Sequence, residues 1–221
     1  MKELQNPNKK LESVIKDSEL SSLAKDYTEL ALDGIIDDSA LKEIPLVGTV
    51  IGVVKFGNSV NEYLFAKKIY KFLFQLHKIP LEKRIQKIDQ INSSKKYQSK
   101  VGEKIFELLD KIDSDGKPEI LGKLFGAVIE EKIDFLNYLR AAHIIKNIFY
   151  YDLVELKSHY DGRWIHGGVT DEIYSNGIVD VDYTISMKEA ENDWNNIPRE
   201  DKYPDTKLSE IGDIIINIGM S

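Results

Sequence analysis

The 221-residue chain contains no cysteine. This absence excludes disulfides, thiolate metal sites and a thiol nucleophile, and it suits a reducing compartment, so we expect a cytoplasmic protein. The sequence also lacks a long apolar run. Its most apolar stretch, residues 44–54, is much shorter than the roughly 20 residues that a transmembrane helix needs. Residues 1–17 are polar and carry no apolar signal-peptide core, so we expect no secretion by that route.

Local catalytic motifs are missing as well. The sequence has no Walker loop, no dinucleotide-binding glycine fingerprint, no G-x-S-x-G and no kinase signature. None of the four histidines has the spacing of a helical zinc site, and His143, among alanines and isoleucines, is interpreted as a packing residue. Residues 113–116 resemble part of a calcium loop, but Gly122 would stand where the essential Glu is required. We therefore predict no cofactor, no metal and no enzymatic activity, although an active site built from distant residues would leave no local motif.

Charge is unevenly distributed along an acidic chain of net charge −7. Residues 67–104 hold 11 Lys and Arg against three Asp and Glu, whereas the flanking segments hold 7 against 11 and 12 against 23. Two interpretations stay open for this basic island. It is either a set of solvated lysine-rich helix faces or the contact surface for an anionic partner. The overall acidity argues against nucleic acid as that partner.

Helical periodicity dominates the first two thirds of the sequence. Polar residues 1–17 form a lead-in that becomes helical late. Residues 46–76 read as one long helix or two abutting ones. Asp134 and Asp152 are expected to cap the last two helices of this region. The predicted helices cover residues 18–32, 46–76, 80–91, 101–112, 118–129, 135–149 and 152–156.

After about residue 150 the pattern changes. Glycines cluster, and residues 178–185 alternate apolar and polar side chains, which predicts a half-exposed strand. Thr170 is expected to cap a short helix that ends at residues 176–177, and Thr206 to cap the final helix, with a long loop or hairpin arm over 187–205. We therefore predict a mainly α protein with three parts: a lead-in (1–17), a multi-helix bundle (18–150) and a small α+β module (151–221).

Two segments are candidates for binding. In the first, Gly48 and Gly52 form a G-x-x-x-G pattern that runs into Lys67, Lys68 and Lys71. The pattern is typical of close helix packing in a soluble core, and also of a membrane-active helix followed by basic residues on anionic lipid. The second interpretation predicts that Gly48→Leu or Lys67→Glu with Lys68→Glu lowers lipid binding.

The second candidate is the glycine-flanked segment 159–168. Arg163 and Trp164, with Tyr160 and His166 beside them, suit a recognition loop because Arg and Trp often dominate binding energy. The alternative is a plain turn whose tryptophan fills the core. A metal site formed by His159, His166 and Asp161 is a weaker possibility.

The order of elements at 135–220, with the segments IYSNGIVDV and TKLSEIGDIIINIG, resembles the end of a winged-helix module. The element in the recognition-helix position, residues 170–176, has two acids and no Lys or Arg, so we expect it to contact protein rather than DNA. A second resemblance rests on four segments: Ile44-Pro-Leu-Val-Gly, Phe65-Ala-Lys-Lys-Ile, Val101-Gly-Glu-Lys and Leu121-Gly-Lys-Leu-Phe. In these segments the chain resembles a group of small bacterial helical proteins that occur in mobile-element and phage-conflict neighbourhoods. That group offers no catalytic residues to transfer.

Three functional hypotheses follow. The first is a non-enzymatic bacterial protein that binds a protein partner or a second copy of itself, in phage defence or a stress response. The second is a membrane-active effector that inserts segment 44–76 at the inner face of the membrane. The third is a winged-helix regulator that binds DNA, whose binding would depend strongly on salt.

Overall fold

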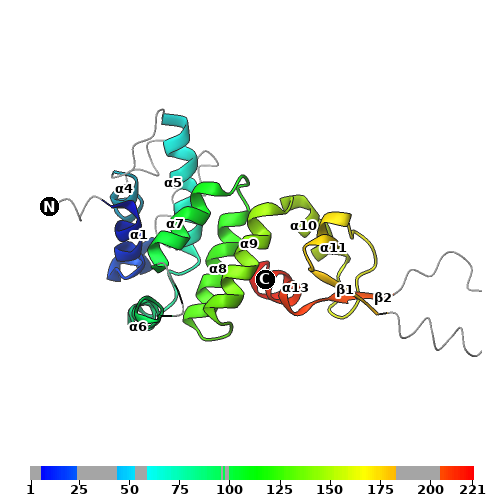
Figure 1. Ribbon diagram of the computed structural model, residues 1–221. Helices are drawn as coiled ribbons and strands as arrows, with labels where there is room; N and C mark the ends of the chain where they lie inside the picture. Colours follow the sequence, from blue (N-terminus) through cyan, green and yellow to red (C-terminus); the bar gives the residue numbers. More distant parts are fainter. Residues whose placement is uncertain (1–5, 24–43, 53–58, 96, 98–99, 183–204) are drawn as a thin grey trace, which may run out of the picture. The chain divides into compact units, whose positions relative to one another are not determined.

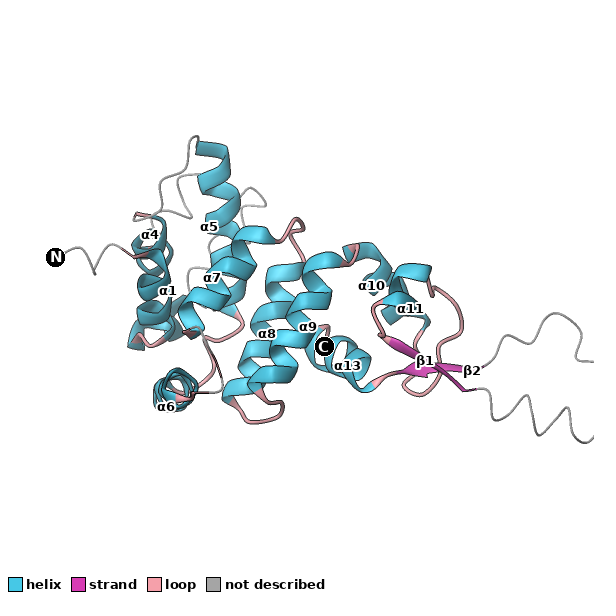
Figure 2. Ribbon diagram, in the orientation of Figure 1, coloured by secondary structure: helices cyan, strands magenta, loops and turns pink. Residues whose placement is uncertain are grey.

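A computed structural model describes residues 6–23, 44–52, 59–95, 97, 100–182 and 205–221 (Figure 1). Over these residues the protein is mainly helical with a small two-stranded antiparallel sheet, as the sequence predicts (Figure 2). The chain divides into two compact units, residues 1–146 and 147–221. The predicted boundary between bundle and C-terminal module lay four residues further along the chain.

The first unit is built from helices alone in its described part. Helices α6 to α9 lie where their periodicity predicted them, and Asp134 caps α9 by accepting the Asn137 N–H at 2.6 Å. The predicted helix over 46–76 comprises α4 and α5, with residues 53–58 outside the described residues. Of the predicted helix over 18–32, residues 18–22 form a 3₁₀ turn, and 24–43 lie outside the described residues. The helices are α1 (Pro7–Ile15), α4 (Pro45–Ile51), α5 (Ser59–Phe74), α6 (Leu81–Ser93), α7 (Val101–Lys111), α8 (Lys117–Ile129) and α9 (Phe135–Asn147).

The polar lead-in contains a packed helix, α1. Its start follows a local rule: the Asn6 side chain accepts the Asn8 N–H at 2.9 Å, and Pro7 occupies the first turn. Leu11 and Ile15 are buried, and α1 packs on α4 and α7. Leu11, Val14 and Ile15 thus form the apolar face by which a mostly polar segment packs on the bundle.

The core of this unit is centred on α8, whose residues are almost all buried, and α5 packs against it. The rings of Phe72 on α5 and Phe125 on α8 lie 6.0 Å apart and are fully buried. Gly122 makes this approach possible, because a Cβ atom there would lie 2.7 Å from the Phe72 carbonyl oxygen. The glycine of the sequence Leu-Gly-Lys-Leu-Phe thus lets two helix backbones approach closely.

A buried arginine links α6 to the end of α1. Arg84 on α6 is 2% exposed, and its guanidinium donates to the backbone carbonyls of Ile79, Ile15 and Asp17. The carbonyls of Ile15 and Asp17 lie at the end of α1 and just after it. The last C=O groups of a helix have no hydrogen-bond donor within the helix. The arginine supplies those partners and ties α1 to α6.

The second unit combines short helices with the sheet. Strands β1 (Val179–Asp182) and β2 (Asp205–Leu208) pair antiparallel, and Ile165 forms a further bridge to Thr206 on β2. Thr170 caps α11 and Gly177 ends it in the left-handed conformation, φ 67°, as predicted. The helical elements are α10 (Tyr150–His159), α11 (Asp171–Ser175), α13 (Glu210–Asp213) and a π-helical turn (Ile214–Gly219).

Two predicted caps in this unit are wrong. Helix α10 begins before Asp152, whose carboxylate instead accepts the Thr170 hydroxyl at 2.8 Å and so links α10 to α11. Thr206 lies in β2, and Ser209 caps α13 through the Gly212 N–H at 3.1 Å. Thr and Ser are both good caps. The difference is set by strand pairing, because β2 continues to Leu208 and the helix can begin only after it.

Candidate functional sites

The first candidate site is the loop of residues 160–166, which one carboxylate organises. Asp161 Oδ1 accepts the backbone N–H groups of Arg163 at 2.8 Å and Trp164 at 2.7 Å, and Oδ2 lies 2.7 Å from His166 Nε2. The Tyr160 hydroxyl donates to the Gly162 carbonyl at 2.9 Å. An Asp that accepts N–H groups two and three residues ahead forms a well-defined turn. The four residues predicted for partner binding therefore lie together in one ordered loop.

The loop displays a stacked pair of side chains. The Arg163 guanidinium carbon lies 5.2 Å from the centre of the Trp164 ring, within cation–π range. Arg163 and His166 are exposed, and Trp164 and Tyr160 are half-buried. Ile165, not Trp164, is the buried residue, with 7% of its surface exposed. Trp164 is therefore less buried than Ile165, and part of its surface remains accessible.

Electrostatics favours the ionised form of Asp161. The Trp164 N–H, the His166 imidazole and the Arg163 N–H all stabilise the carboxylate, and they lower the pKa of Asp161 to about 2. Its contact with His166 is an ion pair only when the imidazole is protonated. The turn is thus held by a charge-assisted network at any pH well above 2.

Other accessible apolar side chains lie in the same unit. Tyr174 on α11 is 42% exposed, and its hydroxyl lies 3.5 Å from Oγ1 of Thr206, the residue that Ile165 pairs with. A separate exposed group stands at the start of α10. Phe149 and Tyr151, with rings 5.5 Å apart, are 58% and 65% exposed.

The lysines predicted for anion binding contact the protein itself. Lys67 pairs with Asp115, Lys68 Nζ donates to the Ile112 carbonyl at 2.6 Å, and Lys71 Nζ donates to the Asp115 carbonyl at 2.7 Å. All three are half-buried, and burial lowers the pKa of Lys68 and of Lys71. These ammonium groups hold the loop between α7 and α8.

The two glycines of the G-x-x-x-G pattern lie at α4. Gly48 is half-buried within the helix, and Gly52 is exposed at its C-terminal end, where its N–H donates to the Gly48 carbonyl at 2.9 Å. No helix within the described ranges is both long enough and apolar enough to cross a bilayer. In the same part of the chain, His, Asp and Glu side chains do not gather in the way that a metal ion requires.

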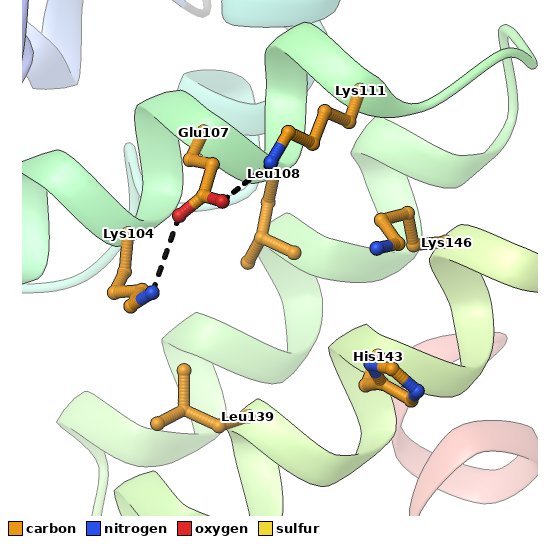
Figure 3. Close-up of a pocket in the computed structure, with 7 residues that line it drawn as sticks. All are labelled: Lys104, Glu107, Leu108, Lys111, Leu139, His143 and Lys146. Carbon is orange, nitrogen blue, oxygen red and sulfur yellow. Dashed lines mark hydrogen bonds and ion pairs between the residues drawn. The ribbon is translucent and has the colours of Figure 1, made fainter.

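The second candidate site is a pocket of about 240 Å³ between α7 and α9 (Figure 3). His143, predicted to pack in the core, is exposed and lines this pocket. The prediction failed because Ala141, Ala142, Ile144 and Ile145 point to the core from either side, which leaves position 143 on the outer face of the helix. The lining residues are Lys104, Glu107, Leu108, Lys111, Leu139, His143 and Lys146.

The sequence held a signal for this pocket that motif reasoning missed. Lys104, Leu108 and Lys111 are spaced i, i+4 and i+7 on α7, and Leu139, His143 and Lys146 have the same spacing on α9. That spacing places each trio on one face of its helix. What the sequence does not reveal is that the two faces meet.

Comparisons with known proteins give no match: no family model, no curated protein and no solved structure is similar to this chain.

Proposed function

We propose that the chain is a non-enzymatic binding protein that recognises a protein partner through Tyr160, Arg163, Trp164 and His166. The observation that carries the proposal is the accessible Arg163–Trp164 pair on a turn that Asp161 holds in place. Arg and Trp are the side chains that most often dominate binding energy at interfaces. A turn that is already ordered loses little conformational entropy on binding, which raises affinity.

The architecture of the second unit supports a winged-helix-like module as the scaffold for this loop. Ile165 forms a bridge to β2, and β2 pairs with β1. The loop therefore lies beside the two-stranded sheet. Helix α11, in the recognition-helix position, carries Asp171 and Glu172 in its first turn. Because these carboxylates would repel phosphates, the module is better suited to protein contact than to DNA. We place this activity in phage defence or a stress response, on the basis of the resemblance noted above.

The membrane-active alternative has less support. It needs Lys67, Lys68 and Lys71 to face lipid, and their ammonium groups contact the loop between α7 and α8 instead. Flotation with neutral and anionic vesicles tests it. The membrane hypothesis would be favoured over protein binding if the chain floats with anionic vesicles only and the double variant Lys67→Glu, Lys68→Glu does not float.

Site-specific photocrosslinking in cells tests the proposal. A benzophenone amino acid replaces Trp164 in one variant and exposed Ser158 on α10 in a matched control. We expect a discrete crosslinked protein from position 164 that is absent at position 158 and weakened by Arg163→Ala. If the crosslinked species is a second copy of this chain, the partner is the protein itself. Equal crosslinking at both positions, or none at position 164, would contradict the proposal.

A further inference from the structure

The pocket between α7 and α9 has an excess of positive charge. Glu107 is its one carboxylate, and it accepts Lys111 Nζ at 2.6 Å and lies 3.2 Å from Lys104 Nζ. These two ammonium groups lower the pKa of Glu107, Lys111 having the larger effect. The Glu107 carboxylate therefore pairs with two lysines of α7 and holds them at the rim of the pocket (Figure 3).

The opposite wall adds a third cation without adding a carboxylate. Lys146 and His143 project from α9, and within the described part of the chain no Asp or Glu lies within ion-pair distance of Lys146 Nζ. The lining thus holds three ammonium groups and one carboxylate, and only Lys104 and Lys111 lie within ion-pair distance of Glu107. Ammonium groups that line one pocket repel one another, and a bound anion relieves that repulsion. The pocket is charged to attract a ligand with more than one negative charge.

The interior of the pocket is partly apolar. Leu108 from α7 and Leu139 from α9 both line it, and both side chains are half-buried. A volume of about 240 Å³ lies below the range of roughly 300–1,000 Å³ that is usual for drug-sized ligands. The ligand that fits is therefore small and combines a charged end with a short apolar body.

We propose that this pocket binds a small organic phosphate monoester. A phosphate monoester carries close to two negative charges at neutral pH, which matches the excess of lysine over glutamate, and lysine is a common phosphate binder. In this arrangement the phosphate contacts Lys146 beside His143, and the organic group lies on Leu108 and Leu139. This site is separate from the loop of residues 160–166, and neither proposal depends on the other.

Three soluble probes separate the contributions: phenyl phosphate, inorganic phosphate and phenol. Titration of the full chain, followed by NMR shifts of the α7 and α9 amides, measures each affinity. We expect phenyl phosphate to bind at least about threefold more tightly than inorganic phosphate because of its apolar ring. Phenol, which lacks the charge, should not shift these amides. Raising the salt concentration should weaken the binding of phenyl phosphate, since the pocket is open to solvent.

Lys146→Gln is the decisive variant, with Lys78→Gln, an exposed lysine outside the pocket, as the matched control. We expect Lys146→Gln to lower the affinity for phenyl phosphate at least about threefold and Lys78→Gln to leave that affinity unchanged. Both variants should have the melting temperature of the parent. Flotation with phosphatidic acid vesicles identifies the source: binding that Lys146→Gln removes indicates a lipid phosphate, and binding by soluble esters alone indicates a metabolite. Equal weakening in both variants, equal binding of phenol, or no shift with any phosphate would overturn the proposal.

Discussion

The Asp161 carboxylate faces the His166 imidazole at 2.7 Å while its other oxygen accepts the N–H groups of Arg163 and Trp164. The Asp161 side chain therefore links three residues of the turn, which backbone hydrogen bonds such as Asp161 N–H to the Trp164 carbonyl also hold. In the proposed recognition, that turn holds the Arg163–Trp164 pair in place before any partner arrives.

Removing this carboxylate should loosen the loop and leave the fold intact. Asp161→Ala deletes the acceptor for two backbone N–H groups, and the loop is exposed, so the cost falls on local order. We expect the Arg163 and Trp164 amides to exchange with solvent at least about tenfold faster, with the melting temperature within a few degrees of the parent. Ser158→Ala, a nearby exposed change, should alter neither amide. Unchanged exchange in Asp161→Ala would mean that other contacts hold the turn.

Acid should have a related effect. Because the pKa of Asp161 is lowered to about 2, the ionised carboxylate contributes to loop order at every pH above its ordinary value near 4. That contribution is lost as the pH falls from about 4 through about 2. NMR shifts of the Arg163 and Trp164 amides should report this titration, and Asp161→Asn should abolish it. A transition that persists in Asp161→Asn would assign the titration to another group.

The contact between α5 and α8 should tolerate no side chain at Gly122. In Gly122→Ala the new methyl group meets the Phe72 carbonyl at 2.7 Å and the Gln75 Cβ at 2.9 Å, so we expect a loss of about 1–3 kcal/mol in the free energy of unfolding. Gly126→Ala is the matched control. There the nearest atom is the flexible Cδ1 of Ile79 at 3.2 Å, and the gain in helix propensity, at most about 1 kcal/mol, should offset any crowding. Urea unfolding of both variants measures the difference, and similar losses would contradict the packing described.

Arg84 should be the most sensitive charged residue of the first unit. Arg84→Met leaves buried carbonyls of Ile79 and Ile15 without their donor, which should cost about 3 kcal/mol in the free energy of unfolding. Arg140→Ala, an exposed arginine on α9, should change stability by less than about 0.5 kcal/mol. Chemical denaturation of the two variants decides the point. A loss below about 1 kcal/mol in Arg84→Met would show that water or neighbouring groups replace the guanidinium.

Local signals in the sequence were sufficient for much of this fold. The caps Asp134 and Thr170 were predicted because a cap and its helix are adjacent in the sequence, and the mainly helical class followed from apolar periodicity. Thr206 was misassigned because its conformation is set by pairing with Val181, which lies 25 residues earlier in the chain. The role of Arg84 could not be predicted either, since its acceptors Ile15 and Asp17 are remote in sequence. Long-range pairing of this kind leaves no local pattern.

In the candidate sites, too, local features were visible in the sequence and long-range contacts were not. The loop of residues 160–166 was recognised from its unusual composition, whereas the choice between Ile165 and Trp164 as the buried residue depends on the bridge to Thr206. The spacing of Lys104, Leu108 and Lys111 was visible in the sequence. Its opposition to His143 and Lys146 is a product of how α7 and α9 pack.

We propose that the loop of residues 160–166, rather than another accessible apolar surface, recognises a partner. Once the protein crosslinked to position 164 is purified, the dissociation constants of Trp164→Ala and Tyr151→Ala measure this directly. Tyr151 is a fair comparison because it is an aromatic residue of the same unit with 65% of its surface exposed. We predict at least about tenfold weaker binding for Trp164→Ala and less than about twofold for Tyr151→Ala. Loss of binding in Tyr151→Ala with no change in Trp164→Ala would contradict the account and move the interface to the start of α10.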